Sequence, residues 1–169
     1  MQFDSRVAHE LTSTVPRRAN MTVVRSIKDP ELTAFERALL DALLGGPLEV
    51  LAKLRAQIAC ARVVSRQLSG VGFFLDFEVP AKATFVDPPN FEISDVYFDL
   101  KGTEHGGAAI LFVRAGAVTM LEAYSHAGDW PDEPEEFSIH CFDGAKRDTA
   151  KVAAEIASRA AFARRPKEK

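Results

Sequence analysis

The sequence has few of the residues from which disulfide frameworks, metal centres and nucleophilic sites are built. It contains 2 cysteines and 4 histidines in 169 residues. Cys60 and Cys141 lack the density and spacing of a disulfide framework or a zinc site, and their apolar neighbours favour small buried side chains. No two histidines stand at the i, i+4 spacing of a helical metal site. We therefore predict no metal and no cofactor.

Several catalytic and targeting motifs are also missing. No serine lies in a G-x-S-x-G elbow, and the glycine-bearing segment GTEHGG lacks the lysine of a phosphate-binding loop. No apolar run approaches the roughly 20 residues that a membrane-spanning helix needs. The first twenty residues mix acids and arginines without the apolar stretch of a secretory signal. These absences lead us to expect a cytoplasmic protein.

Charge is distributed unevenly along an otherwise ordinary globular composition, with 47% hydrophobic and 27% charged residues. The net charge is -3, although residues 146–169 hold eight basic residues against three acidic ones. The rest of the chain is therefore acidic, which disfavours nucleic acid as a partner of the main domain because phosphate contacts need Lys and Arg. The basic tail is the exception, and it is a candidate for binding nucleic acid or an acidic membrane.

Two short helices are expected near the start of the patterned sequence. Asp29 is a candidate cap and Pro30 a candidate first helical residue, and apolar residues then recur at spacings of three and four up to Leu43. Gly45 and Gly46 end this helix, and Pro47 opens a second one. So short a connection predicts that the two helices pack against each other or on a shared sheet.

From about residue 61 the apolar period changes to two, which predicts strands. ARVVSRQL and GFFLDFEV form a first hairpin, and SDVYFDLKG alternates cleanly. AAILFVR is a continuous apolar run, typical of a central strand covered on both faces, and it pairs through Ala115-Gly116 with AVTMLEAY. FSIHCF is a last short strand. The expected fold is α+β, with the helices on one face of a mostly antiparallel sheet of about six strands.

The domain boundaries follow from these patterns. Residues 1–26 form a flexible arm or an extension upstream of Met21, residues 27–143 form one α+β domain, and residues 144–169 form a basic helical tail. The tail is rich in helix-forming residues, but its apolar face is thin, comprising Val152, Ile156 and Ala160. It either docks weakly on the domain or projects from it.

One group of residues raises the possibility of catalysis. The hairpin brings Glu104 and His105, which precede one strand, near His126, which follows the other. Together with Glu122 they would form a metal-dependent or acid–base hydrolytic site, with Glu122, His126 and His105 as catalytic residues. Glu122 shares its predicted strand face with Val118, Met120 and Tyr124, which favours partial burial and a shifted pKa. Its structural alternative is an ion pair with an arginine such as Arg62 or Arg66.

A second group favours protein recognition. The segment DWPDEPEE contains one tryptophan, two prolines and five acids without a base. Aromatic anchors with charged rims are typical of protein interfaces, and clustered acids speed the capture of a basic partner. The partner-binding candidates are Trp130, Asp129, Asp132, Glu133, Glu135 and Glu136. The alternative is a solvated loop whose tryptophan folds back on the core.

The chain also resembles a known group of sequences. LRAQ…ARVVSR before GVGFF, a glycine-bearing turn before ILFVR, and LEAY…WP are together similar to a widespread family of small bacterial proteins with no established activity. The resemblance covers about residues 30–140 and implies the fold boundaries without implying a function. In general form the chain is also similar to bacterial toxin-immunity proteins, which is an analogy of fold only.

These observations favour a non-catalytic binding protein over an enzyme. The most concrete version is an immunity-like or regulatory partner of another protein, with the acidic loop and an exposed strand face as its contact surface. The hydrolase-like enzyme is the alternative. The recognition hypothesis predicts that Trp130→Ala weakens association while the protein still folds.

Overall fold

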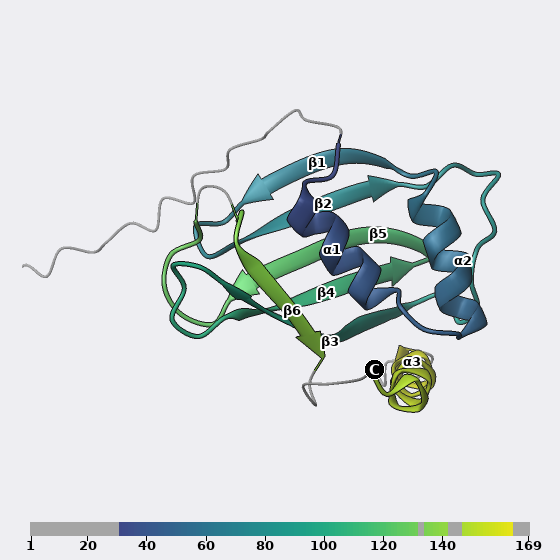
Figure 1. Ribbon diagram of the computed structural model, residues 1–169. Helices are drawn as coiled ribbons and strands as arrows, with labels where there is room; N and C mark the ends of the chain where they lie inside the picture. Colours follow the sequence, from purple (N-terminus) through teal and green to yellow (C-terminus); the bar gives the residue numbers. More distant parts are fainter. Residues whose placement is uncertain (1–30, 132–133, 142–146, 164–169) are drawn as a thin grey trace, which may run out of the picture.

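The computed structural model describes residues 31–131, 134–141 and 147–163, and it has the predicted α+β architecture (Figure 1). The predicted arm, residues 1–26, lies outside the described residues. Two N-terminal helices precede a six-stranded sheet, and one helix follows it. The elements in chain order are α1 (Ala34–Leu43), α2 (Glu49–Ile58), β1 (Arg62–Leu68), β2 (Gly72–Glu78), β3 (Phe91–Leu100), β4 (Gly107–Arg114), β5 (Ala117–Ser125), β6 (Phe137–Cys141) and α3 (Thr149–Ala163).

The sheet has the strand order β1-β2-β5-β4-β3-β6, and every neighbouring pair is antiparallel. Helices α1 and α2 lie over one face of it, and α3 lies beside β3 (Figure 1). The β4–β5 hairpin predicted from the sequence is confirmed. Its turn residues Ala115 (φ 50°) and Gly116 (φ 78°) both have positive φ, as the tight hairpin turn that matches the twist of the strands requires.

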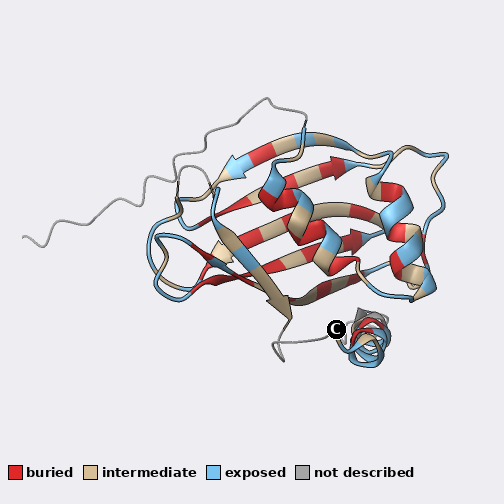
Figure 2. Ribbon diagram, in the orientation of Figure 1, coloured by how far each residue is buried: buried red, intermediate tan, exposed pale blue. Residues whose placement is uncertain are grey.

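The hydrophobic core fills the space between α1, α2 and the sheet. Alternate strand residues are buried, which appears as repeating buried segments along the central strands (Figure 2). Leu111 of β4 and Leu121 of β5 are 0% exposed, and so are Leu39 of α1 and Leu51 of α2. The period-two pattern of the strands therefore places one side chain of every two in the core.

Helix α1 begins later than the Asp29-Pro30 signal predicted, because a capping box at Thr33 sets its start. The Thr33 hydroxyl accepts a hydrogen bond from the Glu36 amide, and the Glu36 carboxylate accepts one from the Thr33 amide at 2.8 Å. This pairing satisfies two amide groups that the first turn of a helix leaves without partners. The prediction for the helix start was wrong because T-A-F-E, four residues further on, is the stronger cap.

A buried ion pair joins α1 to the edge strand β1. Arg66 and Glu36 are 4% and 3% exposed, and the Arg66 guanidinium donates to both carboxylate oxygens of Glu36 at 2.7 and 2.8 Å. It also donates to the Glu31 carbonyl at 2.8 Å. The charges of this pair are thus both compensated and hydrogen-bonded, which is the condition for burying them at tolerable cost.

A second buried polar side chain ties α2 to the hairpin turn. The Gln57 side-chain amide donates to the carbonyls of Thr84 and Gly116 at 2.8 and 2.9 Å, and its oxygen accepts from the Val118 amide at 2.9 Å. Gln57 is 1% exposed. Its three hydrogen bonds fix the position of the β4–β5 turn and of the preceding loop against α2.

Helix α3 docks on the domain and does not project from it, although its apolar face is thin. Val152 and Ile156 are 3% and 5% exposed. Before the helix, Arg147 forms a two-pronged ion pair with Asp95 of β3, with both distances 2.7 Å, and donates to the carbonyls of Ala42 and Gly45 at the end of α1. Within the described residues, no helix combines the length and the apolar character needed to cross a membrane.

Three local expectations were wrong. Cys60 is exposed rather than buried, because it lies just after the end of α2. The β4 run is central in the sheet, but it is not buried on both faces throughout, because Ile110 and Phe112 are partly exposed. In β5 the register shifts at Thr119, so Val118 faces the core and not the side occupied by Met120 and Glu122.

Candidate binding surface

The sheet face opposite α1 and α2 is the most distinctive surface of the described chain. We call it the open face. One helix residue reaches this face: Arg159 of α3 pairs with Glu92 at 2.9 Å. Among the described residues, no other hydrogen bond or ion pair joins a helix to it, apart from the bond of the same Arg159 to Ser94. By the strand register, its central part comprises Phe74, Asp76, Glu92, Tyr97, Ala108, Ile110, Phe112, Met120, Glu122, Tyr124 and His140, and its margins carry Arg62, Ser65, Gln67, Glu78, Asp99 and Ser138.

Most side chains in the central part of the open face are apolar or aromatic, although they lie on the side away from the core, whereas its margins are polar. Ala108 is buried and the other ten are partly exposed. A sheet face that only meets water usually carries polar residues in alternation with the core positions. The open face therefore has the composition of a surface that meets another molecule.

Glu122 lies at the centre of the open face. In the strand register it stands directly opposite Phe74 on β2 and Ile110 on β4. Met120 and Tyr124, two residues before and after it on β5, point to the same side. Four large side chains therefore surround its carboxylate.

This environment changes the acid–base behaviour of Glu122. Burial among these side chains, and then the negative charge of Glu92, raise the pKa of the Glu122 carboxyl above its ordinary value. Arg62 and Arg66, its candidate partners from the sequence, pair with Glu78 and Glu36 instead. Within the described part of the chain, no hydrogen bond or ion pair to Glu122 is found.

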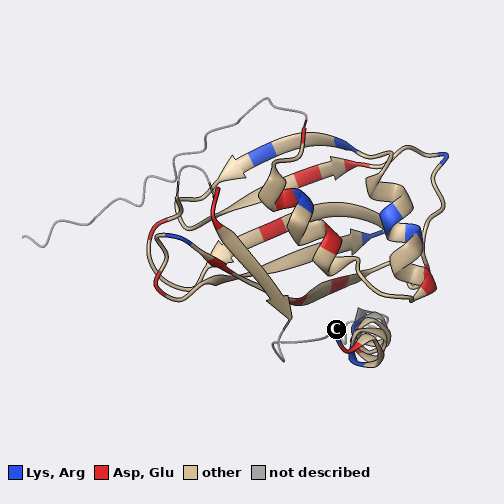
Figure 3. Cartoon of the chain, in the orientation of Figure 1, with Lys and Arg blue, Asp and Glu red and all other residues tan. Residues whose placement is uncertain are grey.

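The remaining charges of the open face are partly compensated. Glu92 accepts from Arg114 at 2.5 Å and from Arg159 at 2.9 Å. Asp76 stands opposite Met120, diagonally across from Glu122, and shares no ion pair with a described residue. The acidic positions of β2 and β5 lie along the middle of the sheet (Figure 3). Two carboxylates of the open face, Asp76 and Glu122, thus form no ion pair within the described chain, and the nearby Arg62 pairs with Glu78.

Four rings cluster at one end of the open face. Tyr124, Ala108, Tyr97 and His140 stand in register across four strands. His126 contacts both tyrosines, with ring centroids 5.6 and 6.4 Å apart, and Tyr97 stacks on His140 at 6.2 Å. The rings close over Ala108, which is 5% exposed. His126 therefore belongs to an aromatic cluster.

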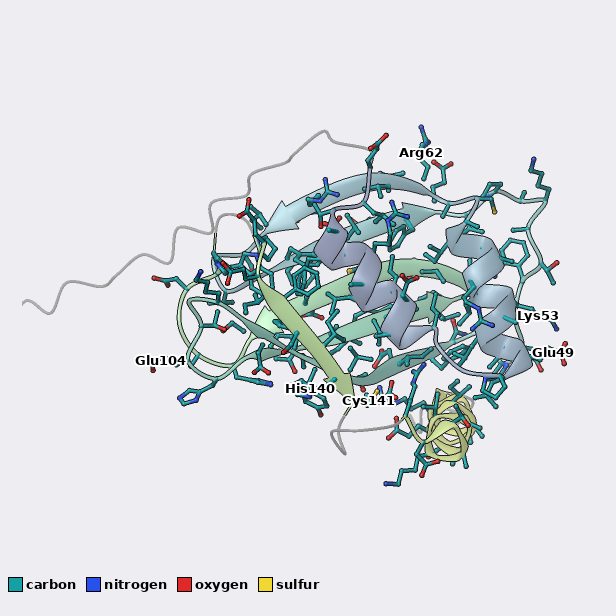
Figure 4. All side chains as sticks on the ribbon, viewed as in Figure 1. Glu49, Lys53, Arg62, Glu104, His140 and Cys141 are labelled. Carbon is teal, nitrogen blue, oxygen red and sulfur yellow. The ribbon has the colours of Figure 1, made fainter. Side chains whose placement is uncertain are left out.

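The structure does not gather the four residues of the hydrolase-like alternative into one site. It places His126 near His105, since the His126 amide donates to the carbonyl of the adjoining Gly106 at 2.9 Å. Glu122 lies within β5, and His126 follows the last residue of that strand, Ser125, so the extended backbone separates their Cα atoms by about 13 Å. His105 and Glu104 are exposed in the β3–β4 turn, and Glu104 projects outward at that end of the molecule (Figure 4). In the ranges that the structure describes, no group of three His, Cys, Asp or Glu residues has the geometry of a metal site.

The acidic loop packs its tryptophan, which is partly buried, against the core. The Trp130 ring contacts Phe35, Phe73 and Phe98 with centroid distances of 6.0, 5.6 and 5.9 Å. Its amide donates to the Gly70 carbonyl at 2.8 Å. Asp129, Glu135 and Glu136 are exposed, Glu136 pairs with Lys101 at 2.5 Å, and Asp132 and Glu133 lie outside the described residues. The loop therefore presents acids rather than an aromatic anchor.

Most of the open face was missed by the sequence reasoning, although a signal was present. In GFFLDFE and MLEAYS, acids alternate with large side chains on the positions that do not face the core. The hairpin register brings these positions side by side, so that Asp76, Glu122 and their neighbours form one surface. Combining the two hairpins, rather than reading each strand alone, would have found it.

No protein-family model, curated protein or solved structure matches the chain. The resemblance to the bacterial family is therefore supported by the sequence motifs alone, and the open face is the feature that indicates a function.

Proposed function

We propose that this protein is a non-catalytic binding module that contacts another protein through its open face. One observation carries the proposal: the mainly apolar and aromatic centre of a sheet face holds two carboxylates, Asp76 and Glu122, that form no ion pair with a described residue. Protein interfaces combine a core of aromatic and aliphatic side chains with charged groups that select the partner. An immunity-like or regulatory role, in which the protein occupies the surface of a basic partner, fits this combination.

The exposed acids of the loop complement this role. Asp129 and Glu135 add negative charge at the end of the sheet, whereas Glu136 is paired with Lys101. Exposed charge of one sign accelerates the encounter with an oppositely charged partner, and it contributes less to the stability of the complex than buried contacts do. We assign the loop to attraction of the partner and the open face to its retention.

The test is site-specific photo-crosslinking in the cells from which the gene comes. A photoreactive phenylalanine analogue at Phe112 probes the open face, and the same analogue at the exposed Ala52 of α2 probes the opposite side. We expect a crosslinked protein from position 112 only. A product from both positions, or none from position 112, would count against the proposal.

The partner identified by crosslinking is then purified on its own, and its binding to variants of this protein tests the open face directly. Ile110→Arg introduces a charge into the open face, and Ala52→Arg introduces the same charge on the exposed side of α2. Calorimetric titration should show that Ile110→Arg abolishes binding while Ala52→Arg retains it. Equal affinities for the two variants, both with unchanged circular dichroism, would remove the open face as the contact surface.

A further inference from the structure

The side chains around Glu122 define the chemistry of a ligand group more narrowly than the open face as a whole. Residues directly opposite each other in an antiparallel pair have Cβ atoms about 4.5–5.5 Å apart. Phe74 is opposite Glu122 on one side, and Tyr124 follows two residues later on the same side of β5. A carboxylate thus lies beside two aromatic residues on a partly exposed surface.

The two arginines that reach Glu92 are already occupied. Arg114 donates to the carbonyls of Phe91 and Val113 and to Glu92, and Arg159 donates to Glu92 and Ser94. The described chain forms no ion pair with the Glu122 carboxylate, so a cation that pairs with it would come from another molecule.

We propose that the open face binds an extended segment of the partner through an arginine side chain. Its guanidinium pairs with the Glu122 carboxylate and lies against the rings of Phe74 and Tyr124. The inference rests on the proposed function and names the group that the surface recognises. Asp76, diagonal to Glu122, adds a second negative charge beside the same position.

Arginine fits this position better than other cations do. Its planar guanidinium pairs with a carboxylate through two parallel hydrogen bonds and stacks on aromatic rings, whereas the lysine ammonium is a compact and strongly hydrated charge. A divalent metal ion would need several ligands in one place, and the described residues offer no such group. The phosphates of nucleic acid would be repelled by both carboxylates.

Binding of an arginine should also change the titration of Glu122. The pKa of the Glu122 carboxyl is raised by burial and by Glu92. A guanidinium at the carboxylate would favour its charged form and lower that pKa. Binding should therefore move the carboxyl titration of Glu122 to lower pH, which a merely structural glutamate would not show.

The experiment is a titration followed by nuclear magnetic resonance with a short Gly/Ser peptide that carries one central arginine. The matched probe is the same peptide with citrulline, which keeps the shape and loses the charge. We expect shifts of the amide signals around Glu122 and Phe74, and at least tenfold weaker binding of the citrulline peptide. Glu122→Gln should weaken binding of the arginine peptide by a similar factor.

Asp41→Asn is the control, because it removes an exposed acid from α1, on the other side of the sheet, and leaves the open face intact. The inference is overturned if Asp41→Asn weakens binding as much as Glu122→Gln does. It is also overturned if the citrulline peptide binds equally well, or if the arginine peptide does not bind.

The same variants separate this inference from the proposed function. A protein partner that is lost with Ile110→Arg but binds Glu122→Gln with unchanged affinity would overturn the arginine recognition alone. A partner that still binds Ile110→Arg would overturn the proposed function and, with it, the arginine recognition.

Discussion

The two faces of the sheet differ in whether a glutamate has a partner within the chain. On the covered face, Glu36 is 3% exposed and receives hydrogen bonds from Arg66 and from the Thr33 amide. On the open face, Glu122 is surrounded by large side chains and has no described partner. A charge that serves the fold is compensated within the chain, because an unpaired buried charge is very costly. A charge left without compensation on a partly exposed apolar surface is a feature that the fold does not need.

Breaking the covered pair should give the largest effect. Arg66→Ala leaves the Glu36 carboxylate buried without its partner, and we expect the free energy of unfolding to fall by about 3–5 kcal/mol. Urea denaturation measures it. Arg62→Ala, on the same strand, is the control because its ion pair with Glu78 is exposed, and its expected cost is below about 1 kcal/mol. Similar losses for the two variants would show that burial does not distinguish the pairs.

Neighbouring residues of β4 compare the two faces with nearly equal side chains. Leu111 faces the core and is 0% exposed, whereas Ile110 lies on the open face and is partly exposed. Leu111→Ala should cost about 2–5 kcal/mol because it creates a cavity. Ile110→Ala should cost about 1 kcal/mol or less, since its position is already in contact with water. If Leu111→Ala and Ile110→Ala lowered the free energy of unfolding equally in thermal and urea experiments, Ile110 would be as buried as Leu111. The open face would then be covered in the free protein.

Trp130 tests whether the acidic loop belongs to the fold or to the interface. Removing a fully buried tryptophan costs about 3–5 kcal/mol, so truncating this half-buried ring should cost about 2 kcal/mol. Trp130→Phe keeps an aromatic contact with Phe35 and Phe73 and should recover most of the loss. Denaturation curves of both variants decide the question. A Trp130→Ala protein of normal stability that binds its partner weakly would instead restore the anchor role predicted from the sequence.

The sequence was sufficient for the fold because its information there is local. Period-two alternation gave the strands, the Ala115-Gly116 turn gave the hairpin, and apolar spacings gave α1 and α2. What it did not give depends on contacts between distant residues. Glu36 and Arg66 are 30 positions apart, and the register shift at Thr119, which moves Val118 to the core side, appears only when β4 and β5 are paired.

The candidate site shows the same limit. Glu122 was singled out from the sequence because apolar residues flank it, and its partial burial is confirmed. Its neighbours on the surface, Phe74 and Ile110, come from two other strands and follow only from the strand register. The acidic loop was identified correctly as acidic, but the position of Trp130 depends on three core phenylalanines spread over α1, β2 and β3.

The smallest expected effect is the pH dependence that Glu122 adds to stability. The pKa of its carboxyl in the folded protein is raised above the ordinary value of 4.5, so between these two values the folded state binds more protons than the unfolded state. Stability must then fall as pH rises through this range, and the penalty is absent below pH 4.5. Because the side chain is partly exposed, solvent screening keeps the penalty under about 1 kcal/mol.

Glu122→Gln removes this titration and isolates the effect. We expect the variant to be slightly more stable than the wild type at neutral pH and to lose that advantage below pH 4.5. Urea unfolding of both proteins across this range measures the difference, with Asp129→Asn as the correction for a general change of net charge. An advantage that grows towards acidic pH would mean that Glu122 is compensated by a cation within the chain. The alternative result is that the Glu122 carboxylate lowers the stability of the free protein at neutral pH and strengthens binding of an arginine peptide. Glu122 then belongs to the binding surface, and binding of the partner offsets the free energy that the carboxylate costs the fold.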